Sequence, residues 1–337
     1  MHATISETTP KPPQLDTAIA ALRFVSMLLI FVCHCFQYYD NELCRWLNVG
    51  VPIFFIISGF LYGSKTAAPD PVVFLRKRFR KILLPYYLFL FIVIPLYFVF
   101  HRDLLHLKDI FHALTCSGTI KGLGHLWFVG YILFCYIITP YLLWFKNSFS
   151  KKPLIHRVLI WLCFMIVVQI LGFAFRSYFL PDRVLCYLLG FALADFYSCA
   201  TKKETTIIHT LLFLLCLVLC SCRLLYNTLP LKSIPSFQSI TVRYSQVALG
   251  VSLFILLRMA FKNVKYTKFL RISDEYSYHF YIVHLLFILS PFTLMATTEM
   301  IPVNCLLALL SSVLSAFILK FISQKVTSSI NRQWPIK

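Results

Sequence analysis

Apolar runs alternate with short charged segments along the whole chain. Ten runs are close to the about 20 residues that a helix needs to cross a bilayer. They lie at 18–37, 46–63, 82–100, 125–145, 155–175, 183–199, 206–225, 241–259, 275–297 and 301–322. A bilayer core offers no hydrogen bonds to the backbone, so spanning segments of this kind are helical. The pattern predicts an all-α polytopic membrane protein with about ten transmembrane helices.

The ends of the chain differ from these runs. Residues 1–14 are polar and Pro-rich, and we expect them to form a disordered cytoplasmic tail. The first apolar run is too long for a signal-peptide core and has no small-residue cleavage site after it, which predicts an uncleaved span. Residues 15–325 are expected to form a single transmembrane domain, followed by a cytoplasmic tail at 326–337.

Composition and charge agree with a membrane domain. The chain is 59% hydrophobic and only 13% charged, whereas a soluble domain carries about a quarter charged residues. The net charge of +19 first suggests nucleic acid. However, 22 of the 32 Lys and Arg lie in the inner segments if the N-terminus is cytoplasmic, as the positive-inside rule requires. The sequence therefore predicts a multi-pass protein of the inner (plasma) membrane with both termini in the cytoplasm, the lipid bilayer as its surroundings and no nucleic-acid partner.

The cysteines do not indicate a metal site. Nearly all of the 12 lie in apolar runs, where a free Cys behaves as a small apolar residue. Cys33, His34 and Cys35 are consecutive, but neighbouring residues on a helix point about 100° apart. We therefore expect no metal there.

Two ionisable residues lie within the first span. Arg23 and His34 are 11 residues apart, which places them on one face of a helix, about 16 Å apart along its axis. Ionisable residues in spans are rarely exposed to lipid, so the spacing predicts an inward-facing polar path. The alternatives are an arginine whose side chain extends to the lipid headgroups and a neutral histidine bonded to a neighbouring carbonyl.

A second polar stripe lies in span nine. Ser277, Tyr281 and His284 follow i, i+4, i+7 spacing and share a helical face. His284 is expected at about the same depth as His34, so the two histidines could converge. A structural hydrogen bond between helices explains the stripe equally well.

Three further sites have both ordinary and functional explanations. The run from Arg76 to Lys81 before span three is either a topology signal near anionic lipid or a phosphate site, since Arg binds phosphate in bidentate fashion. The ordinary explanation for Ser58, beside Gly59, is close packing of span two against another helix. His125 and Trp127 mark the outer end of span four, where Trp127 suits an interfacial anchor.

These stretches together resemble the membrane acyltransferase family 3, the integral-membrane O-acyltransferases of bacterial surface glycans. The resemblance rests on four segments in order: Arg23-x10-His34, GVPIFFIISGFL in span two, KRFRKILLPYY entering span three, and SYHFYIVH in span nine. The LWF at 126–128 adds weak support. The match covers essentially the whole chain.

The resemblance implies a catalytic role for His34 and an acyl-CoA-binding role for Arg23, with Arg78 and Lys81 as the family's basic pair. Ser58, His125, Trp127, Ser277, Tyr281 and His284 are implied as supporting or acceptor-side residues. Many members carry an acidic residue three positions before the arginine, where this chain has Ala20.

The expected function is transfer of an acyl group, as acetyl or another short acyl, from cytoplasmic acyl-CoA to a hydroxyl of a cell-surface or lipid-linked saccharide. His34 would act as a general base or as the carrier of an acyl-histidine relay. No permanently bound cofactor is expected, and partners in glycan assembly are conceivable. The alternatives are a transporter or exporter of a glycan or small solute, since buried polar residues also mark substrate pathways, and a non-catalytic subunit of a glycan-assembly complex. Oligomeric state has no signal in the sequence.

Overall fold

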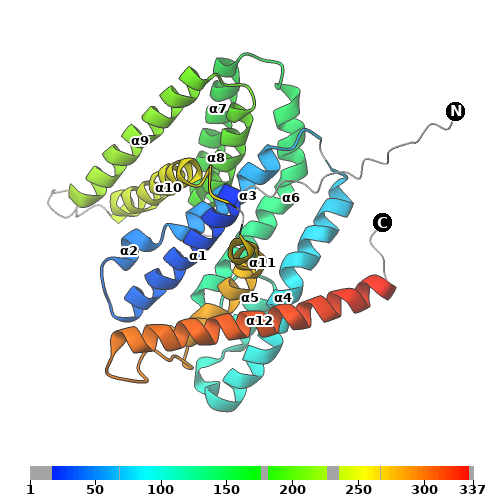
Figure 1. Ribbon diagram of the computed structural model, residues 1–337, viewed down its shortest axis with the longest axis vertical. Helices are drawn as coiled ribbons and strands as arrows, with labels where there is room; N and C mark the ends of the chain where they lie inside the picture. Colours follow the sequence, from blue (N-terminus) through cyan, green and yellow to red (C-terminus); the bar gives the residue numbers. More distant parts are fainter. Residues whose placement is uncertain (1–16, 68, 176–180, 226–234, 266, 334–337) are drawn as a thin grey trace.

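The computed structural model describes residues 17–67, 69–175, 181–225, 235–265 and 267–333, and none of them lies in a β-strand. The all-α prediction is confirmed. The helices, shown in Figure 1, are α1 (Thr17–Tyr38), α2 (Cys44–Leu47), α3 (Gly50–Gly63), α4 (Pro71–Phe100), α5 (Leu107–Leu114), α6 (Trp127–Ser148), α7 (Leu154–Ala174), α8 (Pro181–Tyr197), α9 (Lys202–Leu225), α10 (Pro235–Ala260), α11 (Lys268–Val283) and α12 (Ile301–Gln333). Short 3-10 segments are η1 (Arg102–Leu104), η2 (Gly124–Leu126) and η4 (His284–Phe287).

Eight helical segments in the described part of the chain are long and apolar enough to cross a membrane. They correspond to the predicted spans one to five, seven, eight and ten. The other two predicted spans are also helical but shorter, because α8 has 17 residues and α11 has 16. The predicted cytoplasmic tail at 1–14 lies outside the described residues, whereas α12 continues past residue 325 to Gln333.

The predicted extent of span nine, 275–297, is wrong. Helix α11 begins at Lys268, where Thr267 caps it by accepting a hydrogen bond from the Leu270 amide at 3.3 Å. It gives way at His284 to η4 and then to turns that continue to Met300. Pro291 explains why no helix extends to 297, because a proline disfavours helical geometry in the residue before it. The hydroxyl of Thr293 then donates to the Ile288 carbonyl at 2.7 Å and holds the turn.

Helix α4 begins 11 residues earlier than the predicted span three. Asp70 caps it by accepting from the Val73 amide at 2.8 Å, and Pro71 occupies its first turn, where its missing amide hydrogen costs no helical bond. The basic run 76–81 therefore lies on a helix, and its side chains point in fixed and different directions.

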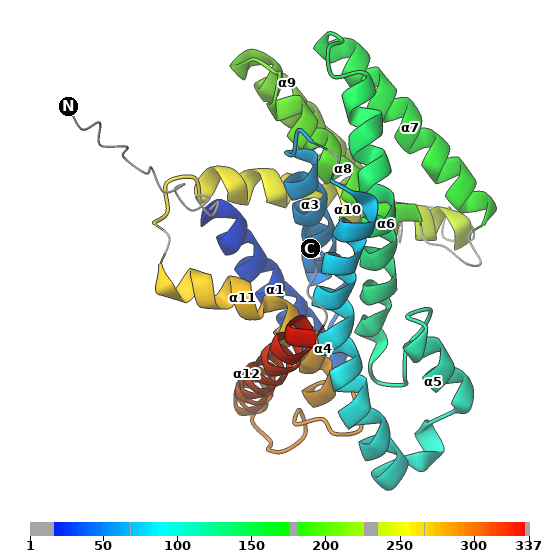
Figure 2. The same ribbon diagram turned by 90° about the vertical axis from the view of Figure 1, so that its right-hand side faces the viewer.

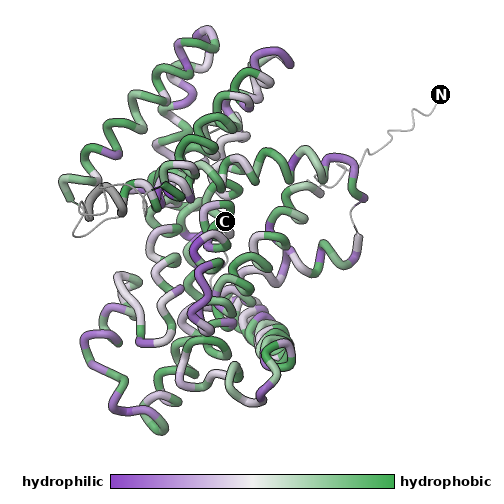
Figure 3. Tube along the Cα trace, turned by 90° about the vertical axis from the view of Figure 1, so that its left-hand side faces the viewer, coloured by the Kyte–Doolittle hydropathy of each residue, from purple (hydrophilic) through white to green (hydrophobic). Residues whose placement is uncertain are grey.

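The centre of the molecule is formed by α1, α3, α8, α10 and α11, with α4, α7, α9 and α12 toward its periphery (Figures 1 and 2). Most of the helical length is apolar, and hydrophilic residues gather mainly toward helix ends and loops (Figure 3). Large apolar side chains such as Phe91, Trp144 and Leu217 are exposed. This arrangement suits a surface surrounded by lipid.

Backbone-to-backbone packing joins α3 to α8. A Cβ on Gly59 would overlap the carbonyl oxygen of Tyr187, and a Cβ on Gly190 would overlap that of Ile56. Small residues allow such close approach between membrane helices, as the sequence indicates for the segment at Ser58 and Gly59. The two helices therefore form a tightly fitted pair at the centre.

A buried ion pair joins α7 to α8. Arg157 bonds Asp195, and the Trp161 indole donates to the same carboxylate at 3.0 Å. All three residues are buried. Arg157 is, with Lys146, one of the 22 Lys and Arg that the sequence places in inner segments. In the structure its charge is neutralised inside the helix bundle.

We predict that Gly59→Ala lowers the thermal unfolding midpoint in detergent by about 5 °C, because overpacking against backbone typically costs about 1–3 kcal/mol. Gly124→Ala is the matched control, since nothing lies within 4 Å of a Cβ there, and its midpoint should be unchanged. Equal midpoints for the two variants would contradict the packing described for α3 and α8.

Candidate active site

One face of α1 carries Arg23 toward its start and His34 toward its end. Arg23 Nη1 forms an ion pair with Asp274 Oδ1 of α11 at 2.5 Å, with 27% of the arginine side chain and 14% of the aspartate side chain exposed. The aromatic contact between Phe31 and Phe280, at 5.9 Å between ring centroids, continues the α1–α11 interface. Arg23 is therefore held inside the bundle by a carboxylate and does not extend to the surface alone.

Three histidines converge at the other end of α1. The ring centroids of His34 and His284 are 5.3 Å apart, and those of His125 and His284 are 4.9 Å apart. The predicted convergence of His34 with His284 is confirmed. His125, expected at the outer end of a span and implied by the resemblance as a supporting or acceptor-side residue, is the third member. The residues come from α1, η2 and η4, three segments far apart in the sequence.

Hydrogen bonds to the backbone set the tautomers of two of these histidines. His284 Nδ1 lies 2.7 Å from the Tyr281 carbonyl oxygen, and His125 Nε2 lies 2.8 Å from that of Ile282. A carbonyl can only accept, so each of these nitrogens carries the hydrogen when the ring is neutral. His284 Nε2 and His125 Nδ1 are then hydrogen-bond acceptors, and neither has a partner among the described residues.

His34 is less enclosed than the other two histidines. Its Nδ1 donates to Gln37 Oε1 at 2.9 Å, one turn further along α1. This bond orients the ring and leaves Nε2 with a lone pair. His34 is thus the histidine of the cluster that combines a fixed orientation with access to a cavity.

A cavity of about 430 Å³ lies against these rings. Its lining combines polar side chains with the flat ring of Trp127 and the guanidinium of Arg183, and consists of His34, Gln37, Asn48, Val51, Gly122, Gly124, His125, Trp127, Arg183, Tyr281, Leu285 and Leu289. Trp127 stacks on Phe55 with ring centroids 6.4 Å apart. Tyr281 donates its hydroxyl to the His125 carbonyl at 2.6 Å and fixes η2 against α11.

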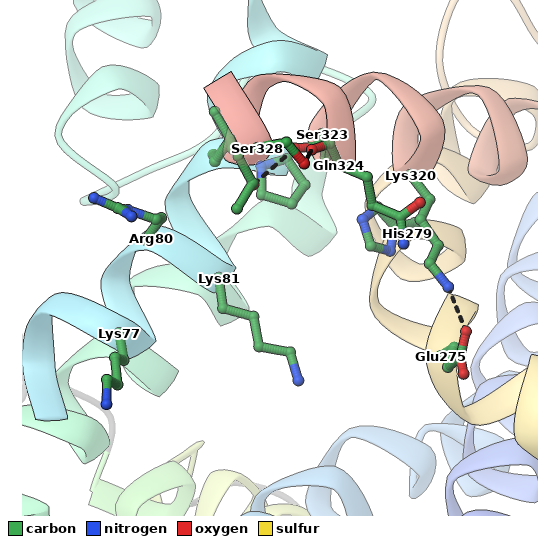
Figure 4. Close-up of a pocket in the computed structure, with 12 residues that line it drawn as sticks. Lys77, Arg80, Lys81, Glu275, His279, Lys320, Ser323, Gln324 and Ser328 are labelled. Carbon is green, nitrogen blue, oxygen red and sulfur yellow. Dashed lines mark hydrogen bonds and ion pairs between the residues drawn. The ribbon is translucent and has the colours of Figure 1, made fainter. Parts of the chain in front are cut away.

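A second and larger cavity, of about 1120 Å³, lies between α4, α11 and α12 (Figure 4). Its lining is mainly basic and hydroxylic: Lys77, Arg80, Lys81, Leu84, Pro85, Glu275, His279, Lys320, Ser323, Gln324, Thr327 and Ser328. Lys320 pairs with Glu275 at 2.7 Å. Lys81 extends into the space between the helices (Figure 4) and lies within electrostatic reach of Arg23, Arg78, Asp274 and Lys320.

Arg78 points in a different direction from Lys81. Its guanidinium lies over the rings of Tyr62 and Phe74, at 5.1 and 5.7 Å from their centroids. It shares with Arg23 an electrostatic interaction with the hydroxyl of Tyr62. The three basic residues named from the sequence therefore surround one region, between the start of α1 and the basic cavity.

The remaining predicted residues do not reach the histidines. Ser277 donates to the Asp274 carbonyl at 2.9 Å within its own helix. Ser58 is within hydrogen-bonding reach of Tyr136. No contact between either serine and the three histidines is seen in the described part of the chain.

Asp274, Gln37, Arg183, His279 and Lys320 were missed by the sequence reasoning. For Asp274 a signal was present, because it lies three residues before Ser277 and seven before Tyr281. It thus continues the polar stripe of span nine toward the start of α11. Gln37 likewise lies one turn after His34 on the same helix.

Cys33 and Cys35 do not join the cluster as ligands. Cys33 Sγ donates to the Cys44 carbonyl at 3.2 Å, and Cys35 faces Cys305 of α12. No group of three or more His, Cys, Asp or Glu residues within the described ranges is arranged to hold a metal ion.

The sequence was compared with models of known protein families. A family model described as an acyltransferase domain, of acyltransferase family 3, matches residues 16–322. The chain belongs to acyltransferase family 3. It is a multi-pass membrane acyltransferase. The matched range includes the histidine cluster and the part of the basic cavity that α4, α11 and Lys320 form. The transporter interpretation gains no support. No curated protein and no solved structure matches this family member.

We predict that the Arg23–Asp274 pair shows a coupling energy in a double-mutant cycle. Asp274→Leu alone should destabilise the protein by about 1–3 kcal/mol, because it leaves a largely buried guanidinium without its partner. The double variant Arg23→Met/Asp274→Leu should recover part of that loss. Thermal unfolding of the four proteins in one detergent measures this, and strictly additive changes would show that the pair is not coupled.

Proposed function

We propose that this acyltransferase is acyl-CoA-dependent and moves an acetyl or other short acyl group from cytoplasmic acyl-CoA to a hydroxyl of a cell-surface or lipid-linked saccharide, at the inner membrane. One observation carries the proposal. A single helix, α1, has basic groups gathered around its Arg23 end and three histidines gathered around its His34 end. The donor would bind at the first end and react at the second.

The charge of the basic region suits the phosphates of coenzyme A. Arg23, Arg78 and the lysines of the basic cavity outnumber the carboxylates of Asp274 and Glu275. A terminal phosphate carries about −1.5 to −2 charge at neutral pH, and arginine and lysine are its usual protein partners. Ser323, Thr327 and Ser328 line the wall of α12, and each donates its hydroxyl to a carbonyl of its own helix, so the positive charge of the cavity comes from its lysines and arginine.

The acyl-bearing arm of the donor would follow α1 toward His34. Arg23 and His34 are about 16 Å apart along the helix axis. His34 Nε2 would take the proton of the saccharide hydroxyl as that oxygen attacks the thioester carbonyl. The C–S bond then breaks, and the CoA thiolate leaves and receives a proton. The saccharide would enter through the cavity lined by Trp127 and Arg183.

An acyl-histidine route uses the same residues. His34 Nε2 would attack the thioester first, release CoA and then pass the acyl group to the hydroxyl. Incubation with radiolabelled acetyl-CoA and no acceptor separates the two routes. Only the acyl-histidine route leaves covalent label on the wild-type protein, and His34→Ala should then carry no label.

We predict that detergent-purified protein binds acetyl-CoA and CoA saturably in a calorimetric titration. Arg23→Ala should weaken binding of both by about tenfold, the loss expected when a charge-assisted hydrogen bond is removed. Lys320→Ala tests the wall of the basic cavity in the same way. Lys152→Ala, which removes an exposed basic residue outside this region, is the control. A folded wild type that binds neither compound would remove acyl-CoA as the donor.

We predict that His34→Ala lowers acyl transfer at least about 100-fold, the usual contribution of a general base, while acetyl-CoA binding is retained. Transfer is followed as acetylation of membrane glycan in cells and as release of CoA thiol by the purified protein. His156→Ala, which removes an exposed histidine of α7, should behave as wild type. Normal glycan acetylation by His34→Ala would exclude His34 from the reaction.

A further inference from the structure

The histidine cavity contains one cation that the proposed transfer does not use. Arg183 lies in the first turn of α8, and its guanidinium carbon is 4.6 Å from the centroid of the Trp127 ring. The side chain is 17% exposed and lines the same cavity as His34. This places a permanent positive charge beside the site where the saccharide would bind.

The local charges do not balance. Asp182 is buried and contacts two arginines, Arg183 through Nε at 3.2 Å and Arg243 through Nη1 at 3.8 Å. One carboxylate between two guanidinium groups leaves a net positive charge. None of the described residues that line the cavity is acidic, so no second carboxylate supplies the missing charge there.

The geometry of Arg183 leaves its outer end available. Its ion pair with Asp182 engages Nε, and no hydrogen bond of the two terminal nitrogens occurs within the part of the chain that the structure describes. Those two nitrogens form the fork that binds a carboxylate or phosphate in bidentate fashion. A buried or half-buried cation without a full counter-charge is costly, and an anionic ligand would remove that cost.

The rest of the cavity suits a sugar. His125 lines the cavity, and its Nδ1 is an acceptor without a partner among the described residues, so it matches a hydroxyl donor. Gln37 and Asn48 offer both donors and acceptors. An uncharged sugar would satisfy all of these groups but not Arg183.

We propose that the acceptor is an anionic saccharide, and that Arg183 binds its carboxylate or phosphate while one of its hydroxyls faces His34. This inference rests on the proposed function and adds a substrate class to it. Arg183 is then the residue that determines acceptor specificity.

The test compares sugars that differ at one carbon. Methyl glucoside, methyl glucuronide and methyl glucoside 6-phosphate are offered to the protein in phosphatidylcholine nanodiscs, where no anionic lipid competes for Arg183. Binding is measured by tryptophan fluorescence without donor, and transfer is measured with radiolabelled acetyl-CoA. At least one anionic sugar should bind about tenfold more tightly than the glucoside, as expected for a charge-assisted pair. Which one does so identifies carboxylate or phosphate.

Two arginine variants separate this role from a structural one. Arg183→Gln should abolish the preference, so that the anionic sugar binds no more tightly than the glucoside to this variant. Arg243→Gln removes the other arginine of the same carboxylate, outside the cavity lining, and should keep the preference. Arg183→Lys should restore part of it, because the charge returns without the bidentate fork.

The outcomes distinguish the two proposals. If no anionic sugar binds or accepts better than the glucoside, or if Arg183→Gln and Arg243→Gln change the preference equally, the role of Arg183 is overturned. The wild-type comparison of the anionic sugars with the glucoside tests the proposal by itself, so it remains decisive if Arg183→Gln fails to fold. If acetyl-CoA does not bind but the anionic sugar is still preferred, acyl-CoA is overturned as the donor and the anionic saccharide stands as the acceptor.

Discussion

The Arg23–Asp274 ion pair is the interaction on which the site depends. An arginine in an apolar helix must be neutralised by another part of the protein, and here a carboxylate of α11 does so. The pair fixes the rotation and the depth of α11 against α1. About three turns further along, this alignment brings His284 to His34 and places the Tyr281 and Ile282 carbonyls where they set the two neighbouring tautomers. The geometry of the histidines thus follows from charge neutralisation at the opposite end of the helix.

The same requirement operates elsewhere in the bundle. Arg157 is neutralised by Asp195 and supported by Trp161, and Lys146 donates to the backbone carbonyls of Gly63 and Lys65 at 2.8 and 2.6 Å. Both cations were read from the sequence as loop charges that set orientation. In the structure they also close the ends of α6 and α7 against α8 and against the end of α3. A positive charge near a membrane surface can therefore serve topology and packing at once.

Most of the fold, and the matched depth of His34 and His284, could be predicted from the sequence, because both follow from apolar length and periodicity. Apolar length defines the spans, and 11-residue and i, i+4, i+7 spacings define faces. Periodicity carries no information about which helices meet. The contact of His125 with His284 depends on η2. The acid opposite Arg23 is Asp274, 251 residues away in the sequence, whereas the position three before Arg23, acidic in many family members, is Ala20. The end of α11 at Val283 was missed because apolar residues continue beyond it, although Pro291 argues against a helix as far as 297.

The close fit of α3 against α8 has a mechanical consequence. Where two backbones touch through Gly59 and Gly190, no side chain lies between them that could rotate, so the two helices can shift only as one body. The basic cavity is bounded differently, by long lysine side chains and serine hydroxyls of α4 and α12. Its shape can follow a ligand through rotamer changes alone, which take place in picoseconds to nanoseconds for exposed side chains. The molecule thus combines a rigid α3–α8 pair with a cavity wall whose exposed Lys77 and Lys81 side chains can adjust to a large anion without helix movement.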